Sequence, residues 1–411
     1  MGVEVVEQMW SFITRAVDSR QFYSSRLFVD VHQTAISFGL SLLVLALVYY
    51  WFTLSPWSVK SSKSGLKVPP SNTWMLPLIG ETIHLAINVD TYGASRVQRY
   101  GEMFSSHLFG VSAVVVTNVE AIKHVLASPN QKNFISMLPP SIRKHFGPES
   151  VNQIPASTPM HTNLRRLFYQ RTKGENVSGL IATVDAVVKT TLNSWPERGT
   201  VKAYQELKKI LHNVRVTINA AYEPSAVALT WLLKFLAENP DDLQEIIAEH
   251  RAIADSKGSK EYELTYQDTL RMPASTRAFL ETNRVVIPNF GVIRTATKDE
   301  ELHGKLIPKG WTLFLPFRPT HYDPKYYPDP YKFNPSRFKT IPPQPGIFLA
   351  FGSGPRICPG GDLAKTQALV FLHRLVLGYR WELLGRSDAM RTVPVPVPRG
   401  YLPIRVTRIE E

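Results

Sequence analysis

The sequence predicts a mainly α-helical protein with small β-sheets behind an N-terminal transmembrane helix. Three observations predict this fold class. Thr34 to Leu54 is dominated by Leu, Val, Ala and aromatic residues, Asp241 to Ser256 carries Leu and Ile on one helical stripe, and two short apolar segments flank Gly110 as in a β-hairpin. Of the 411 residues, 44% are hydrophobic and 20% are charged, which is enough for a large buried core and excludes a disordered chain.

The apolar segment is long enough to cross a bilayer, which takes about 20 apolar residues in a helix. No Asp, Glu, Lys or Arg occurs from Val31 to Val59, and aromatic residues gather toward one end, as in an interfacial belt. Lys60, Lys63 and Lys67 follow, so the positive-inside tendency predicts a single-pass protein with its larger part in the cytosol. We therefore expect residues 1–33 to form an N-terminal segment and residues 34–54 to form the transmembrane helix; a buried core helix is the alternative.

Proline and asparagine mark element boundaries in the rest of the chain. Residues 55–80, rich in Ser, Lys, Gly and Pro, indicate a linker and a proline-rich hinge. Asn118 is placed to cap the helix that follows it, a strongly apolar helix should end near Asn239-Pro240, and Pro273 suits the first turn of another helix. A further helix is predicted from about Gly361 to Tyr379. We expect residues 81–411 to form one domain.

The charge balance and the single cysteine narrow the function classes. Lys and Arg exceed Asp and Glu by 47 to 34, a net charge of +13 that suits an anionic partner. The surplus is spread along the chain, which argues against a nucleic-acid-binding tail, and a solvated basic surface is the alternative. One cysteine permits no intrachain disulfide and excludes zinc sites built on cysteine clusters.

Several short motifs carry a resemblance to a known family. FGSGPRICPG (Phe351–Gly360) fits the pattern FxxGxRxCxG at every fixed position, and ETNR (Glu281–Arg284) fits ExxR. MHTNLRRLF supplies His161 and Arg165 as HxxxR, while FNPSRF and VIRTA supply Arg337 and Arg294. PPSNTWMLPLIG fits the hinge pattern PPGxxGxPxxG at Pro69, Pro70, Pro77 and Gly80 and departs from it at Ser71 and Trp74. On these motifs the chain resembles the membrane-bound members of the cytochrome P-450 family over roughly residues 60 to 411.

The resemblance implies a heme b cofactor (iron protoporphyrin IX) with Cys358 as the axial ligand. An electron-rich thiolate suits a heme iron that must split O–O, and glycines let the backbone approach the ring closely. A helix start just after Cys358 would bring the positive end of a dipole toward sulfur. The cofactor contacts that it implies are His161, Arg165, Arg294, Phe351, Gly352, Arg356 and Gly360. It also implies a structural triad of Glu281, Arg284 and Arg337. The alternative is a Gly-rich turn beside a buried cysteine.

Two features depart from the family pattern. The helix expected to carry AGx(D/E)T(T/S) reads AAYEPS, so Glu223 matches the acid, Pro224 replaces the Thr, and Ser225 offers a hydroxyl shifted by one residue. We take Glu223 and Ser225 as the catalytic candidates. Only 57 residues separate Arg165 from Glu223, too few for all the helices that roof the family's substrate pocket. The sequence therefore predicts an internally shortened form, truncated between about 172 and 215, with part of the distal helices missing.

Three functions follow from the resemblance. The first is a monooxygenase that hydroxylates a hydrophobic steroid- or terpenoid-like substrate, because the C-terminal segments resemble the plant clan of hormone, sterol and terpenoid hydroxylases. It would use O₂ and electrons from NADPH through NADPH–cytochrome P-450 reductase, at the endoplasmic reticulum membrane and in contact with membrane lipid. The second is a heme-thiolate isomerase or lyase that does not activate O₂, which Pro224 favours. The third is a catalytically impaired, membrane-anchored shortened isoform. No nucleic-acid partner is expected.

Overall fold

The computed structural model divides into two units, Met1–Val59 and Lys60–Glu411. The structure describes residues 26–54, 65–70, 80–87, 89–127, 132–136, 156, 158–172, 174–207, 219–258, 262–385, 390–391 and 396–410. Much of the predicted linker and hinge, including Pro77, lies outside these residues. Pro69, Pro70 and Gly80 lie within them.

The first unit contains one described helix, α2 (Arg26–Leu54), of 29 residues. Its described side chains are largely exposed, with Phe38 at 66%, Leu45 at 63% and Tyr49 at 72%. None of the helices in the described part of the chain combines the length and the apolarity that a membrane crossing requires. A helix thus covers the predicted residues 34–54, and its role as a transmembrane span stays a prediction.

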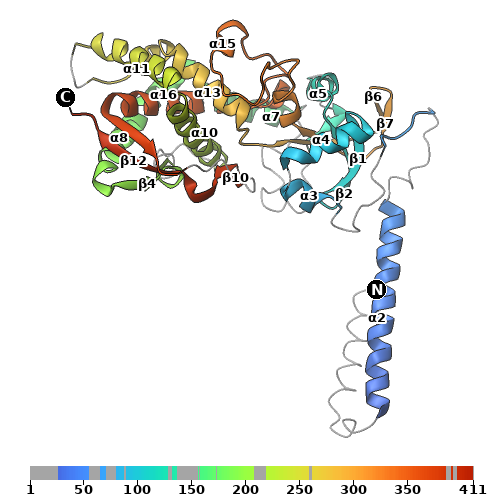
Figure 1. The fold of residues 1–411 in the computed structure, drawn as a ribbon. Coiled ribbons are helices and arrows are strands. Elements are labelled where there is room, and N and C mark those ends of the chain that lie inside the picture. Colours follow the sequence, from blue (N-terminus) through green and yellow to red (C-terminus); the bar gives the residue numbers. More distant parts are fainter. Residues whose placement is uncertain are drawn as a thin grey trace. The chain divides into compact units, whose positions relative to one another are not determined.

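The second unit is mainly helical, as predicted (Figure 1). Its α-helices are α3 (Thr82–Ile87), α4 (Val89–Tyr100), α5 (Val119–Leu126), α7 (Pro159–Thr172), α8 (Ser178–Asn193), α10 (Asn219–Glu238), α11 (Pro240–Asp255), α12 (Tyr266–Leu270), α13 (Pro273–Val285), α14 (Arg318–His321), α15 (Arg337–Thr340) and α16 (Gly361–Gly378). Short 3₁₀ turns are η3 (Gly174–Val177), η4 (Pro196–Arg198), η5 (Gly354–Arg356) and η6 (Arg399–Tyr401).

The strands form small sheets. They are β1 (Met103–Leu108), β2 (Val111–Val116), β3 (Phe134–Ile135), β4 (Thr200–Lys202), β5 (Gly291–Ala296), β6 (Glu300–Leu302), β7 (Lys305–Ile307), β8 (Thr312–Pro316), β9 (Tyr379–Leu383), β10 (Met390–Arg391), β11 (Val397–Pro398) and β12 (Pro403–Arg408). The largest described sheet has the order β1-β2-β8-β5-β3, in which only β2 and β8 pair parallel. A second sheet has the order β4-β12-β9, and β6-β7 and β10-β11 are isolated pairs.

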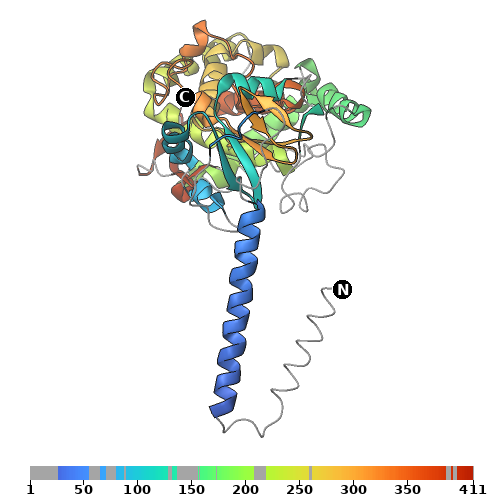
Figure 2. The same ribbon diagram turned by 90° about the vertical axis from the view of Figure 1, so that its right-hand side faces the viewer.

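The largest sheet and the main cluster of helices occupy different ends of the second unit. Helices α8, α10, α11, α13 and α16 gather at one end, and β1 and β2 lie with α3, α4 and α5 at the other (Figure 1). Figure 2 views the unit from the sheet-bearing end. The main core lies among the helices, where α10 buries a continuous run from Ala226 to Leu233 and α16 buries one from Thr366 to His373. Both helices are mostly apolar and buried on every side over these runs, as expected of helices enclosed by others.

The local sequence signals are confirmed where the structure describes them. Strands β1 and β2 pair antiparallel around Gly110, as the hairpin pattern predicted. The Asn118 side chain accepts the backbone N–H of Ala121 at 2.9 Å and so caps α5. Helix α10 ends at Glu238, α11 begins at Pro240, and Pro273 is the first residue of α13. Pro224 lies inside α10 near its start, so the helix tolerates it.

Candidate functional site

The site is organised around the loop from Leu349 to Gly360, which precedes α16. The Cys358 N–H donates to the Phe351 carbonyl at 2.7 Å, and the Gly352 N–H donates to the Leu349 carbonyl at 2.8 Å, which folds the loop back on itself. Gly354 has φ +70°, and a Cβ there would lie 2.1 Å from the Leu126 carbonyl oxygen. Only glycine therefore fits this position, because any side chain would collide with the backbone of α5.

The Cys358 side chain is exposed at the end of this loop. The protein around the loop nevertheless raises the pKa of its thiol by desolvation, while the Gly360 N–H and the Arg165 guanidinium act in the opposite direction. A Cβ at Gly360 would lie 3.9 Å from the sulfur, and α16 begins one residue later. A thiol with a raised pKa becomes a thiolate at neutral pH when a metal cation binds it, and the nearby helix N-terminus favours the anion.

Three guanidinium groups and an imidazole gather beside the loop. Burial lowers the pKa of Arg294 to about 10 with the help of Arg356, and burial and Arg165 lower the pKa of Arg356 to about 10. Burial, Arg356 and Arg165 lower the pKa of His161 to about 4. Cations that depress one another's pKa in a buried place form an attractive site for anions.

Two buried nitrogens of this cluster lack a protein partner. Within the described residues, Nε2 of His161 and Nε of Arg294 are buried without a hydrogen-bond acceptor. Buried polar atoms are nearly always satisfied, so such atoms indicate a missing partner. Donors and positive charges arranged in this way fit the two carboxylates of a heme.

Helix α7 presents these groups along one stripe. His161 and Arg165 are one turn apart, Thr172 lies two turns beyond Arg165, and all three are buried. Arg165 Nη2 donates to the Ile357 carbonyl at 2.5 Å, and Thr172 Oγ1 donates to the Pro359 carbonyl at 2.8 Å. The helix therefore holds the peptide groups on both sides of Cys358. The sequence analysis missed Thr172, although its spacing from Arg165 placed it on the same face.

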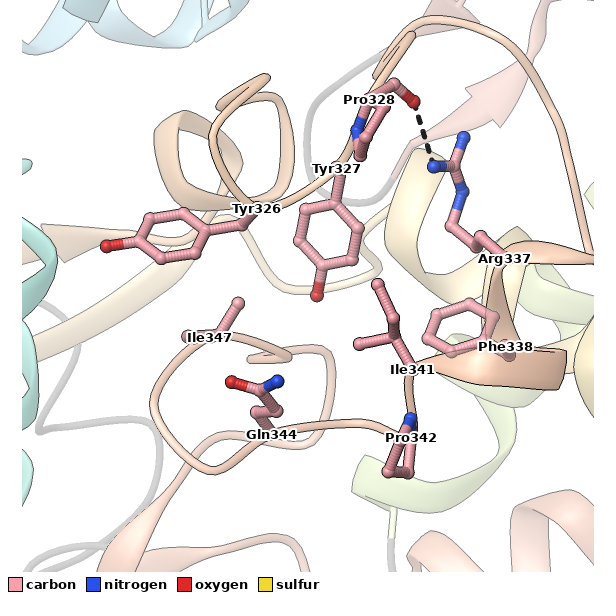
Figure 3. Close-up of a pocket in the computed structure, with 9 residues that line it drawn as sticks. All are labelled: Tyr326, Tyr327, Pro328, Arg337, Phe338, Ile341, Pro342, Gln344 and Ile347. Atoms are coloured by element: carbon pink, nitrogen blue, oxygen red, sulfur yellow. Dashed lines mark hydrogen bonds between the residues drawn. The ribbon is translucent and has the colours of Figure 1, made fainter.

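The residues of the predicted structural triad meet in a buried cluster. Arg284 donates to both oxygens of Glu281 at 2.8 and 2.9 Å, and Arg337 Nε donates to Oε1 at 3.0 Å. Glu281 and Arg284 are fully buried. At its other end Arg337 Nη1 donates to the Pro328 carbonyl at 2.9 Å, at the rim of a small pocket (Figure 3). That pocket has a volume of about 50 Å³, too small for a terpenoid.

The other loop residues predicted to contact the cofactor include Phe351 and Gly352, which shape and pack the loop. The Phe351 ring stacks against Phe279 of α13 with centroids 6.2 Å apart, and a Cβ at Gly361 would lie 3.4 Å from it. Gly352 has φ +76°, a conformation that favours glycine. Phe351 thus connects the loop to the helix that carries Glu281.

The catalytic candidates on α10 have partners of their own. Tyr204, from a helical segment at residues 203–207, donates its hydroxyl to Glu223 Oε2 and stacks on Tyr401 with centroids 5.7 Å apart. Ser225 is buried on the same helix. The sequence analysis did not predict Tyr204, which lies 19 residues before Glu223 without a motif to mark it.

The chain is similar to known proteins in sequence and in fold. The family model that matches the chain is cytochrome P-450, over residues 197–394. Abscisic acid 8'-hydroxylase 2 of Oryza sativa subsp. indica is 30% identical over 450 residues, which cover 85% of this chain and 88% of the relative. Abscisic acid 8'-hydroxylase 2 of Arabidopsis thaliana is 28% identical, with 86% and 92% covered. A retinoic acid-bound cyanobacterial CYP120A1 matches in fold with a TM-score of 0.75 at 21% identity, covering 84% of this chain and 100% of that one.

Proposed function

The chain belongs to the cytochrome P-450 family of heme b monooxygenases, and on that basis we propose that Cys358 is the axial thiolate ligand of the heme iron. The observation that carries the proposal is the convergence of the exposed Cys358 side chain with a buried cationic cluster that needs anions. His161, Arg165, Arg294 and Arg356 would hold the two propionates. Phe351, Gly352 and Gly360 would shape the loop beneath the ring.

When bound, heme would supply O₂ activation: with two electrons and two protons, one oxygen atom would enter a C–H bond of the substrate and the other would leave as water. The residues of this chain bind and orient the cofactor. Arg165 and Thr172 hold the peptides around Cys358, which leaves the Gly360 N–H directed at the sulfur. Hydrogen bonds to the sulfur tune how strongly it donates electrons. Glu281 holds Arg284 and Arg337 together in a buried cluster.

The proposed substrate is a terpenoid-like hormone of the abscisic acid type. The support comes from the relatives, whose names state abscisic acid 8'-hydroxylation and of which this chain spans 88% and 92%. We favour this substrate over a sterol, the other class that the sequence resemblance suggested. The overall change would be the hydroxylation of one carbon, with NADPH and O₂ consumed and water released.

The proposed electron donor is an acidic reductase of the NADPH–cytochrome P-450 reductase type. The net charge of +13 favours an acidic partner. Arg277, Lys339 and Lys365 line a surface hollow between α12, α13, α15 and α16. Glu245 pairs with Arg277 and Lys339, and Asp362 pairs with Lys365, so three cations face two carboxylates there. Lys365 lies five residues after the cysteine loop, near the start of α16. This hollow is therefore close in sequence to Cys358, the proposed iron ligand. Arg166 on α7 adds an exposed cation.

The proposed location is the endoplasmic reticulum membrane, with residues 34–54 as the anchor and residues 81–411 as the cytosolic catalytic domain. Large apolar side chains exposed along α2 support attachment to lipid, since such a surface is costly in water. Expression of residues 60–411 beside the full chain tests it: the full chain should sediment with microsomes after carbonate treatment and the shorter form should not. Equal release of both would refute anchoring by this segment.

Specific observations also favour two other functions, a heme-thiolate isomerase or lyase and a catalytically impaired isoform. Pro224 in α10 has no hydroxyl, which favours a heme-thiolate isomerase or lyase that does not activate O₂. The alignments with both relatives extend over 450 positions, more than the 411 residues of this chain, so they open gaps in it. Those gaps support the shortened form, and with it a catalytically impaired isoform.

Reconstitution of the protein with heme tests the three proposed functions together. Heme-loaded protein should give a thiolate-type ferrous–CO band, and Cys358→Ala should abolish it. Hydroxylation of abscisic acid that requires both NADPH and reductase supports the monooxygenase. Turnover of a hydroperoxide without reductase supports the isomerase or lyase. A thiolate band without either activity supports the impaired isoform. A Cys358→Ala protein with the unchanged band would refute the proposed ligation.

A further inference from the structure

A fully buried histidine at the end of α14 connects the Glu281–Arg284 pair to the cysteine loop. His321 Nε2 accepts the backbone N–H of Leu349 at 2.7 Å, and its Nδ1 lies 3.1 Å from the Arg284 carbonyl. Leu349 is the first residue of the loop, and its own carbonyl accepts from Gly352. Hydrogen bonds thus run from Glu281 to the loop through this one imidazole.

Arg284 and His321 each bond through the side chain to the backbone carbonyl of the other. The Arg284 side chain donates to the His321 carbonyl at 2.8 Å, while the His321 side chain bonds to the Arg284 carbonyl. Residues 37 positions apart therefore fix each other's backbone. The imidazole is also stacked on Phe348, with centroids 5.6 Å apart and an interplanar angle of 15°. A ring held on both edges and on one face has no freedom to rotate.

These contacts select one chemical form of the ring. A carbonyl only accepts, so Nδ1 must carry the proton; an amide N–H only donates, so Nε2 must be bare. That is a neutral imidazole with a single tautomer. Burial lowers the pKa of His321 to about 3, in agreement with the neutral form.

We propose that His321 is a positioning residue for the thiolate ligand: through the Leu349 N–H it fixes where the cysteine loop starts, and thereby where Cys358 presents its sulfur. The proposal rests on the ligation by Cys358 proposed above. Without this acceptor the Leu349 N–H would be buried and unpaired, and the start of the loop would shift toward water or another acceptor. Nothing in the motif FxxGxRxCxG includes this residue.

Replacing His321 by either of the two amide side chains tests the two ring nitrogens separately. Asparagine places its amide near Nδ1, so His321→Asn keeps a donor for the Arg284 carbonyl and loses the acceptor for Leu349. Glutamine reaches the Nε2 position, so His321→Gln keeps the acceptor for Leu349 and loses the donor. His321→Phe keeps the stacked ring and loses both bonds. The control is His250→Phe, since His250 is equally buried but bonds to His373 and Ser275 of other helices.

The readout is the ferrous–CO spectrum of heme-loaded full-length protein, which distinguishes thiolate from thiol ligation independently of turnover. We expect His321→Asn and His321→Phe to shift the thiolate-to-thiol ratio by about tenfold toward thiol, as loss of a buried hydrogen bond implies. His321→Gln should retain most of the thiolate band. His250→Phe should lower stability and leave the band intact.

Equal effects of His321→Asn and His321→Gln, including equal failure to fold or equal absence of change, would overturn the proposal, because the ring would then act only by packing. A wild-type protein that lacks the thiolate band would refute the ligation by Cys358 instead. The two failures are therefore distinguishable in one set of spectra.

Discussion

Replacing Glu281 by glutamine should be among the most damaging single changes in this chain. The carboxylate is fully buried and accepts four hydrogen bonds, from Arg284 Nε and Nη2, from Arg337 Nε and from the Asn334 N–H, at 2.8 to 3.0 Å. Glu281→Gln turns one acceptor oxygen into a donor facing a guanidinium and leaves two arginines without their counter-charge. Removing one partner of a buried ion pair costs about 3–5 kcal/mol. That is a large part of the 5–15 kcal/mol that stabilises a typical domain.

The same substitution at an exposed ion pair gives a matched control. Glu245 is 44% exposed and pairs with Arg277 at 2.7 Å and Lys339 at 3.2 Å. Surface pairs contribute about 0–1 kcal/mol, so Glu245→Gln should change little. Denaturant titrations followed by Soret absorbance and tryptophan fluorescence measure both variants. The reasoning fails if Glu281→Gln unfolds within about 1 kcal/mol of Glu245→Gln, since the buried charges would then be compensated in some other way.

Three further results are expected. Three fully buried histidines should contribute up to about 4 kcal/mol per pH unit to a fall in stability as pH drops from 6.5 toward 4, measured in denaturant titrations. Burial lowers their pKa, while the unfolded chain binds their protons from about pH 6.5. Those histidines, with pKa values of about 3, 3 and 4, are His250, His321 and His373. A flat profile would contradict this; the raised pKa values of Asp242 and Glu249 oppose part of the slope. Gly354→Ala should yield protein without heme, whereas Gly310→Ala, at φ +81° with open space around it, should cost only about 1–2 kcal/mol and keep its heme. Thr172→Val should lose about 0.5–1.5 kcal/mol and release heme faster to apomyoglobin, and an unchanged rate would show that the bond to Pro359 is unimportant.

The elements that could be predicted are those with local physical causes. Asn118 caps α5 and Pro273 opens α13 because a cap or a fixed φ acts within one turn. The Glu281–Arg284 pair forms because three residues in a helix place both side chains on one face. For the same reason His161 and Arg165 share a face of α7. The spacing of residues within single helices was thus enough to predict these two pairs of site residues.

The contacts that could not be predicted join residues far apart in the chain. His321 reaches Leu349 across 28 residues and Arg284 across 37, and nothing in its own neighbourhood marks it as a partner of either. The Thr172 hydroxyl meets the Pro359 carbonyl across 187 residues. Such pairs depend on how whole elements pack, because a backbone carbonyl has no sequence signature. Thr172 alone offered a clue, its position on the stripe of Arg165.

The region between α7 and α10, which the sequence predicts to be shortened, bears most directly on activity. Between α7 and α10 the described residues form α8, the 3₁₀ turns η3 and η4, β4 and a short helical segment at residues 203–207. This segment brings Tyr204 against Glu223 and Tyr401. The Glu223 carboxylate is thus oriented by a tyrosine hydroxyl whose own ring is held by stacking on Tyr401. Any proton transfer by Glu223 would therefore depend on Tyr204, a residue of this same region. The region in which the sequence predicts missing roof helices thus also supplies a partner of the acid on α10, so its length and the chemistry at Glu223 have to be tested together.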